Sequence, residues 1–127
     1  MNYKEINNRI KQINIENKIW IIYIGIIILS WYSNYLEEVY FKTDNKYYKQ
    51  EYQKTIILIF TVLTIIYFYF LKSSIEDINN LKNSDSIKKK QLTYLSFIAS
   101  LLIFISGLIF LYISIIDEDI NVEIAFN

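Results

Sequence analysis

Three long blocks of uncharged, mostly apolar residues dominate the pattern along the chain. They cover residues 19–36, 55–71 and 92–116, and they contain no Asp, Glu, Lys or Arg, although charged residues make up 20% of the chain. At about 1.5 Å per residue these blocks would reach roughly 27, 26 and 38 Å as helices, and a bilayer core is about 30 Å thick. A soluble fold would interrupt them with polar residues every few positions. The pattern therefore predicts an all-α membrane protein with three transmembrane helices.

The backbone favours helix over other structures in these blocks. Hydrocarbon offers no water to backbone amides, and a helix satisfies them within one segment. The alternative, three buried helices of a soluble bundle, would need polar faces that the blocks lack. The first block follows basic residues, as the core of a secretory signal does, but residues 30–35 lack small residues at the A-x-A spacing of a cleavage site. We therefore expect an uncleaved anchor.

Positive charge is divided unevenly between the two sides that three spans would create. The N-terminal segment and the second connection hold nine basic residues, which are Lys4, Arg9, Lys11, Lys18, Lys72, Lys82, Lys88, Lys89 and Lys90. The first connection and the C-terminal tail hold four, which are Lys42, Lys46, Lys49 and Lys54. Because short cytoplasmic loops retain Lys and Arg, we expect a cytoplasmic N-terminus and an outer C-terminus.

The polar segments complete a single three-span membrane domain over residues 1–127. Residues 1–18 form a cytoplasmic basic segment in which Ile6, Ile10 and Ile13 recur at helical spacing. This spacing favours an interfacial helix, either separate or running into the first span, and the other interpretation is a frayed basic leader.

The first connection, residues 37–54, is expected to be an outer loop. It is rich in Tyr and mixed charge, and residues 43–46 are its best turn. The aromatic residues of this loop would either form a recognition surface or lie at the membrane interface.

The second connection, residues 72–91, is expected to form a cytoplasmic helical hairpin between the second and third spans. Ile75, Ile78 and Leu81 recur three apart, and a cluster of Asn, Ser and Asp residues then breaks the pattern. The second helix would continue about two turns beyond its span. The third would begin with an N-cap chosen from Ser84, Asp85 and Ser86.

The acidic outer tail, residues 117–127, ends in strict alternation. Ile120, Val122, Ile124 and Phe126 are separated by polar or small residues, which is typical of a strand. Such a strand would have to join a partner, or the tail would present its terminal carboxylate. The other interpretation is a disordered tail or one that lies on its own first loop.

Aromatic and basic residues mark the expected membrane interfaces. The interfacial anchors are Trp20, Tyr23, Trp31, Tyr32, Tyr35 and Tyr94. An inner lipid contact is expected at Lys88, Lys89 and Lys90, where each basic residue gains about 1 kcal/mol from anionic lipid. Retention of topology alone would explain the same lysines.

Small residues in the third span predict a helix-packing face. Ser100, Gly107 and Ser114 recur every seven residues, and the full set is Ser96, Ala99, Ser100, Ser106, Gly107 and Ser114. Such residues let helix backbones approach closely in a membrane. The face would pack against the first two spans or against a second copy. Interhelical hydrogen bonds are also expected from Ser30, Ser33, Asn34, Thr61 and Thr64.

Composition excludes several kinds of function. The chain has no His and no Cys, and its 13 basic and 13 acidic residues balance. We therefore expect no thiol or zinc chemistry, no nucleic-acid binding and no cofactor. No phosphate-binding loop or nucleophile–base pair is present, so we expect no enzyme and infer no small-molecule substrate. Asp117, Glu118 and Asp119 would bind a divalent cation weakly at best.

These observations favour a non-enzymatic accessory, scaffold or immunity-type component of a membrane complex. Its partners would be the lipid bilayer and either another protein or a second copy of the chain. The alternative is a self-assembling, holin-like pore lined by the small face of the third span. Three-span holins typically keep a basic C-terminal tail in the cytoplasm, whereas this tail is acidic and expected outside.

Overall fold

The computed structural model describes residues 2–124 and contains, in that range, three helices and no strand. They are α1 (Tyr3–Thr43), α2 (Lys46–Asn79) and α3 (Ile87–Ile116). All three are long and apolar enough to cross a membrane. The all-α class and the three apolar helices predicted from the hydrophobic pattern are thereby confirmed.

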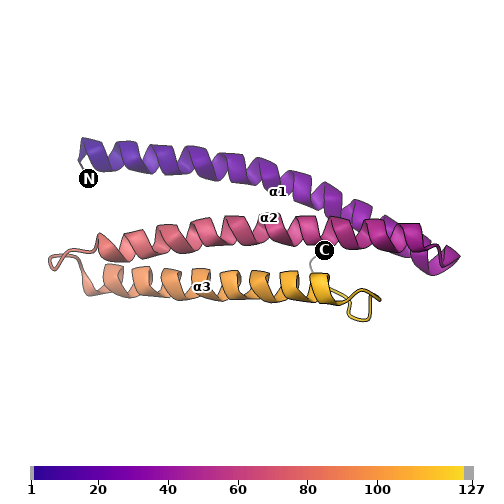
Figure 1. Ribbon diagram of the computed structural model, residues 1–127. Helices are drawn as coiled ribbons and strands as arrows, with labels where there is room; N and C mark the ends of the chain where they lie inside the picture. The colour runs from indigo at the N-terminus through magenta and orange to yellow at the C-terminus, as the bar shows by residue number, and fades with distance from the viewer. Residues whose placement is uncertain (1, 125–127) are drawn as a thin grey trace.

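The helices form an open layer with α2 in the middle (Figure 1). Within residues 2–124, α1 and α3 each pack on α2 and not on each other. Towards its N-terminus α1 diverges from α2, and long polar side chains bridge the widening gap. Gln12 Nε2 donates to Ser73 Oγ at 2.8 Å, and Lys82 Nζ lies 3.8 Å from a Glu5 carboxylate oxygen.

Burial is concentrated on α2 because it has a neighbour on two sides. Ile56, Ile59 and Phe60 are at most 2% exposed. On α1 the buried positions Ile19, Ile26 and Ser33 recur every seven residues, the spacing of helices that pack nearly parallel or antiparallel. Leu36 completes this face at 2% exposure. These residues form the core.

The connection between α1 and α2 is a turn of two residues. Asp44 ends α1 in the left-handed conformation with φ 53°, and its N–H donates to the Tyr40 carbonyl at 2.7 Å. Asn45 then begins α2 by accepting a hydrogen bond from the Tyr47 N–H at 3.0 Å. The expected turn at residues 43–46 is present, but the rest of the expected outer loop is helical, since it contains no Pro or Gly to stop either helix.

The N-terminal segment is the first part of α1 rather than a separate element. The Asn2 side chain caps this helix by accepting from the Glu5 N–H at 2.9 Å. The helix then continues without interruption to Thr43. At about 1.5 Å per residue, its 41 residues reach roughly 62 Å, about twice the thickness of a bilayer core.

The second connection is a short turn, not a separate helical hairpin. Helix α2 ends at Asn79 and α3 begins at Ile87 with Ser86 as N-cap, whose hydroxyl accepts from the Lys89 N–H at 3.1 Å. Asp85 closes the turn by accepting from the Lys82 N–H at 2.7 Å. Ser86 is one of the three residues expected as the N-cap. On either side of the turn, the remaining residues of 72–91 extend α2 and α3.

Over its described part the tail does not form a strand but lies on its own first connection, which is one of the alternatives given above. Ile120 has a positive φ of 54°, which a strand does not allow. Instead the Asp117 carboxylate accepts hydrogen bonds from the N–H groups of Asn121 and Val122, and the chain folds back so that Ile124 is buried. The alternating apolar residues therefore serve a local core. Phe126, named in the same pattern, lies outside the described residues.

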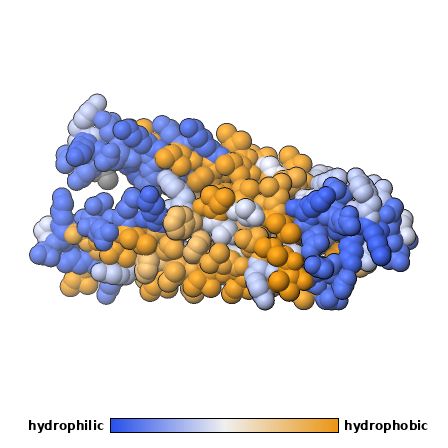
Figure 2. Space-filling view, viewed as in Figure 1, coloured by the Kyte–Doolittle hydropathy of each residue, from blue (hydrophilic) through white to orange (hydrophobic). Residues whose placement is uncertain are grey.

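A broad apolar surface covers the middle of one face of the molecule (Figure 2). Figure 2 shows it as a band, with hydrophilic residues gathered at both ends. Ile21, Ile65 and Leu102 are each at least 60% exposed. A monomeric soluble protein rarely exposes a continuous apolar surface of this extent, so the band fits contact with lipid.

The contact between α2 and α3 is close at Gly107. A Cβ atom added there would lie 2.9 Å from Tyr67 Cδ2 and 3.2 Å from Thr64 Oγ1. Rings pack on either side of this point, with centroids 5.4 Å apart for Phe60 and Phe110 and 5.7 Å apart for Phe68 and Phe104. The glycine is thus needed where it stands, because a side chain would separate the two helices.

The two glycines of the chain provide a matched test of this packing. Gly107→Ala should destabilise the fold by about 1–3 kcal/mol, because the new methyl group overpacks the contact with Tyr67. Gly25→Ala should be neutral or slightly stabilising, because a Cβ there meets nothing within 4 Å. Unfolding by dodecyl sulfate in mixed micelles, followed by circular dichroism, measures both. Equal effects of the two substitutions would contradict the assignment.

Candidate functional site

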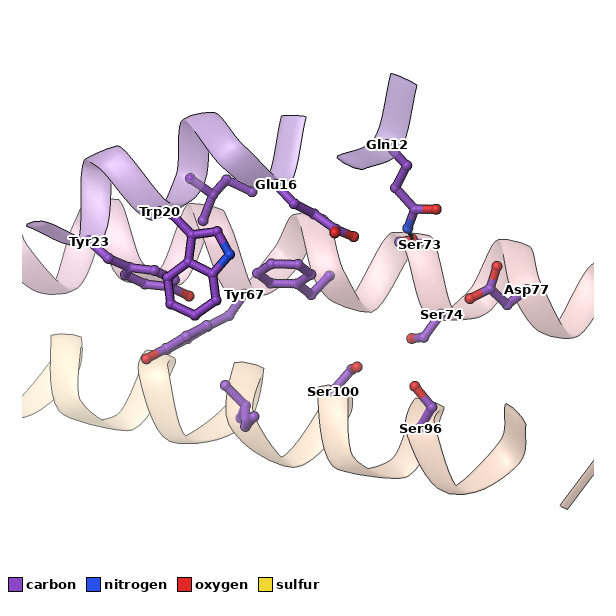
Figure 3. A pocket seen from close by; sticks show the side chains of 13 residues that line it. Gln12, Glu16, Trp20, Tyr23, Tyr67, Ser73, Ser74, Asp77, Ser96 and Ser100 are labelled. Carbon is purple, nitrogen blue, oxygen red and sulfur yellow. Dashed lines mark hydrogen bonds between the residues drawn. The ribbon is translucent and has the colours of Figure 1, made fainter. Parts of the chain in front are cut away.

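A cleft of about 510 Å³ lies at the end of the layer where α1 diverges. All three helices line it, and its floor belongs to α2 (Figure 3). The lining residues are Gln12, Glu16, Ile19, Trp20, Tyr23, Tyr67, Phe70, Ser73, Ser74, Asp77, Ser96, Ser100 and Ile103. A cleft of this size with a few polar groups among apolar walls is typical of a binding site.

One end of the cleft is aromatic. Figure 3 shows the rings of Trp20, Tyr23 and Tyr67 gathered there. Trp20 and Tyr23 meet edge to face with centroids 5.5 Å apart. The α1 residues of this wall lie one turn apart, which is why they share a face. The aromatic end lies at the inner ends of the expected first and second spans.

The other end of the cleft is polar and acidic. The Glu16 carboxylate lies 3.5 Å from Arg9 Nη1, whereas Asp77 has no ion pair within residues 2–124. Desolvation raises the pKa of Asp77, and the nearby Glu76 adds to this, while the Arg9 guanidinium acts in the opposite direction. Asp77 is therefore the carboxylate whose charge is least compensated in the cleft.

A second groove, of about 630 Å³, adjoins the cleft at Asp77 and Ser96, which line both. Lys88 and Lys89 border this groove on the side away from the aromatic wall. Lys89 Nζ is held at 3.2 Å from the Asp85 carboxylate. Basic residues thus adjoin the cleft but do not line it.

The small residues of α3 divide into two groups. Gly107 and Ser114 are buried, and Ser100 is half-buried at the cleft. Ser96, Ala99 and Ser106 are exposed, so they take no part in packing within the chain. Ser100, Gly107 and Ser114, which recur every seven residues, face α2. The other three small residues of the predicted packing face do not.

The sequence suggested that hydroxyl groups in the spans bond across helices. In the structure they bond to carbonyl groups of their own helix. Ser33 donates to the Ser30 carbonyl at 2.7 Å, Thr61 to Ile57 at 2.7 Å and Thr64 to Phe60 at 2.6 Å. A carbonyl three or four residues earlier is always within reach of such a hydroxyl. The expectation of interhelical hydrogen bonds at these positions was therefore wrong.

Most of the expected interfacial anchors are exposed on the surface of their helices. Exposure is 79% for Trp31, 64% for Trp20 and at least 47% for Tyr32, Tyr35 and Tyr94. Tyr23 differs, because it is half-buried and lines the cleft. Trp20 also contributes to the cleft, so two residues expected as anchors take part in this site.

The three lysines expected at the inner lipid surface lie in the first turn of α3. Lys88 has no ion pair within residues 2–124, while Lys89 pairs with Asp85 and Lys90 Nζ donates to the Asn83 carbonyl at 3.3 Å. Two of these ammonium groups therefore hold the turn before α3, and Lys88 is the one left to contact lipid.

At the opposite end of the layer the tail closes the space between α2 and α3. Lys49 Nζ lies 2.8 Å from the Asp119 carboxylate, and Ile120 and Ile124 pack against the core that includes Tyr52. Asp117 and Asp119 of the acidic cluster are thus used in protein contacts, while the Glu118 side chain is exposed, and no cluster of potential metal ligands occurs in the part of the chain described.

Sequence reasoning missed the polar half of the cleft. Gln12, Glu16, Ile19 and Tyr23 are three or four residues apart, so the sequence places all four on one face of a helix. The hydrophobic pattern alone does not include Gln12 and Glu16, because both lie outside the uncharged block. Asp77 carried no comparable signal, because only the fold shows that it lies between α1 and α3.

The comparisons with known proteins provide no relative. No protein-family model matches the sequence, and neither a curated protein nor a solved structure matches it. The function is therefore argued from the geometry alone.

Attachment of the tail should depend on pH through Asp117. Backbone hydrogen bonds from Asn121 lower the pKa of Asp117 below its usual value. A lowered pKa means that the ionised group stabilises the folded tail, so this contribution is present above about pH 4 and lost as the pH falls further. A spin label on Val122→Cys should be immobile at neutral pH and mobile in acid.

Substitutions separate this carboxylate from its neighbours. Asp117→Asn should mobilise the label at neutral pH, whereas Glu118→Gln, which changes an exposed side chain that makes no hydrogen bond within residues 2–124, should leave the transition unchanged. An immobile label in Asp117→Asn at neutral pH would refute the role assigned to Asp117.

Proposed function

We propose that this chain is a multi-pass membrane protein that serves as a non-enzymatic accessory or scaffold component of a membrane complex. Its N-terminus and the turn before α3 would be cytoplasmic, and its C-terminus would be outside. The apolar band supports the membrane location (Figure 2). The basic residues support the orientation, because the N-terminus and the 80–86 turn lie at the same end of the layer (Figure 1).

The observation that carries the scaffold proposal is the position of Gly25. It lies in the middle of the expected first span, on the exposed side of α1, where a Cβ would meet nothing within 4 Å. Glycine inside a helix costs about 0.5–1 kcal/mol relative to alanine. Nothing within residues 2–124 requires it. In a membrane, such a residue lets the backbone of another helix approach.

The partner would therefore contact the outer face of α1. Ile21 and Ile28 are 69% and 61% exposed and lie beside Gly25 on this face. A helix of another protein or of a second copy would pack into the notch between them. An immunity-type role, in which the chain shields the membrane from a toxin, would use the same contact.

A holin-like pore has less support. Its water-filled lining would need the Ser100, Gly107 and Ser114 face of α3, but Gly107 and Ser114 are buried against α2 and the tail. Ser33, on α1, is fully buried as well. Forming such a pore would require the helices to separate and rotate. Tight liposomes at every protein density would match the scaffold proposal, and flux above a threshold density would favour the pore.

Labelling of single cysteines tests the proposed orientation. The natural chain has no Cys, so Gln50→Cys and Ser84→Cys each provide one thiol at an exposed position. A membrane-impermeant maleimide added to intact cells should label position 50, and position 84 only after the membrane is opened. The reverse pattern would show the opposite orientation, and labelling of both from outside would contradict three spans.

Enlarging Gly25 tests the partner contact. Gly25→Leu should reduce co-purification of the partner, or self-association, by about tenfold, because the side chain fills the notch while the fold of the chain itself is not disturbed. Crosslinking in native membranes followed by mass spectrometry provides the measurement. Ile27→Phe, which adds bulk to an exposed residue on another side of α1, is the matched control. Unchanged association in Gly25→Leu would remove the proposal.

A further inference from the structure

The cleft combines a carboxylate without a counter-ion, an aromatic wall and free hydroxyl groups. Asp77 has no ion pair in residues 2–124, and Glu16 shares its charge with Arg9 across 3.5 Å. Trp20 and Tyr23 form the wall, and Figure 3 shows both carboxylates on the same side of these rings. This combination has not been used in the function proposed above.

We propose that the cleft binds an amphipathic ammonium ion, with its charged group at Asp77 and Glu16 and its apolar part against Trp20 and Tyr23. The geometry suits both halves of such a ligand, because the polar and aromatic ends adjoin one another within one cavity of about 510 Å³. The bound group would be a primary or substituted amine attached to a hydrocarbon body.

The charge of the site selects a cation. The charged residues that line the cleft are two acids, while Arg9 is paired at its rim. Lys88 and Lys89 lie in the adjoining groove. An anion placed at Asp77 would meet a carboxylate that has no ion pair within residues 2–124 and whose charge Arg9 only partly offsets, whereas an ammonium group would donate hydrogen bonds to it. The rings add an attraction for the same sign of charge, since a cation is drawn to the face of Trp or Tyr.

The hydroxyl groups provide further acceptors. Ser96 and Ser100 project from α3 towards the carboxylates in Figure 3, and neither side chain makes a hydrogen bond within residues 2–124. An ammonium group has up to three donors, so a carboxylate and one or two hydroxyl oxygens would satisfy it. The Ser73 hydroxyl already accepts from Gln12, which makes it less available.

The apolar part of the ligand follows from where the cleft lies. Helices α1 and α3 line it without packing on each other, at the level where the expected spans begin on the inner side. Ile103 and Phe70 extend the apolar lining towards the middle of the layer. A hydrocarbon chain entering from the bilayer would lie along this surface while its ammonium group remained near the headgroups.

Two sources would supply this chemistry. One is a phospholipid with an amine headgroup, and the other is a free amphipathic amine. Both place the same charged group at Asp77, so the site itself does not distinguish them. The experiment therefore has one arm for each source.

The first arm uses three small probes that share a six-carbon chain: hexylammonium, hexanoate and hexanol. Trp31→Phe leaves Trp20, in the wall of the cleft, as the single Trp of the chain. Titration of the full-length protein in a neutral detergent should change the Trp20 fluorescence saturably with hexylammonium and not with the other two. Equal responses to all three would show partitioning of the chain alone and would overturn the proposal.

Substitutions identify the carboxylate. Asp77→Asn should weaken hexylammonium binding by about tenfold, since it removes a charged hydrogen-bond acceptor. Glu76→Gln removes the same charge from the neighbouring residue, which does not line the cleft, and should change binding by less than about twofold. Asp77 makes no hydrogen bond within residues 2–124, so circular dichroism should show an unchanged fold. Equal binding by the two variants would overturn the proposal.

The second arm tests lipid. Native mass spectrometry of the protein from nanodiscs holding equal amounts of phosphatidylethanolamine and phosphatidylglycerol should show retained phosphatidylethanolamine that hexylammonium displaces, if lipid is the source. Without such retention, saturable hexylammonium binding would identify a free amine as the source. A crosslink from position 20 to another protein's helix, with no amine binding, would overturn the proposal in favour of a protein partner.

Discussion

Two requirements govern the whole structure. Apolar side chains must be kept out of water, and backbone amides must be hydrogen-bonded. The three apolar blocks meet both conditions as helices that are long and apolar enough to cross a membrane, where their exposed side chains would meet lipid. In a bilayer the hydrophobic effect does not drive helices together, because lipid is as apolar as the core. Association must come from close packing, and the position of α2 between its neighbours reflects this. The tight contact at Gly107 and the ring pairs beside it hold α3, while the seven-residue spacing of Ile19, Ile26 and Ser33 holds α1.

The two ends of the layer differ because they are joined differently. At one end, a two-residue turn ties α1 to α2, and the tail folds over α2 and α3 through Lys49 and Asp119. At the other end no turn joins α1 to α2, and the two helices are held there by polar bridges such as Gln12 to Ser73. The helices diverge where the tethers are weakest. The cleft is thus a consequence of the chain topology as much as of the residues that line it.

Sequence patterns predicted the parts of the fold that depend on solvation and local hydrogen bonding. The uncharged blocks located the three helices, the turn at Asp44 falls within the predicted residues 43–46, and Ser86 is one of the three N-cap candidates that local residue preferences indicated. Parts that depend on long-range contacts were not predictable in this way. The alternation in the tail looked like a strand, but its apolar residues found a nearer partner in the start of α2 and the end of α3. Likewise, Asp77 enters the site only because α1 and α3 leave a space between them.

The distribution of hydroxyl partners explains why the cleft is the chemically available part of the molecule. Deep in the apolar band, hydroxyl groups donate to carbonyls of their own helix, as at Thr64 and Ser114. This removes the cost of an unpaired donor in hydrocarbon and leaves no group to bind a ligand. Ser96 and Ser100 do not follow this rule, and they face the carboxylates of the cleft. Among the serines of α3, the two that make no such bond line the cleft, so the same energetic rule that pairs the other hydroxyl groups leaves these oxygens available to a ligand of the kind proposed above.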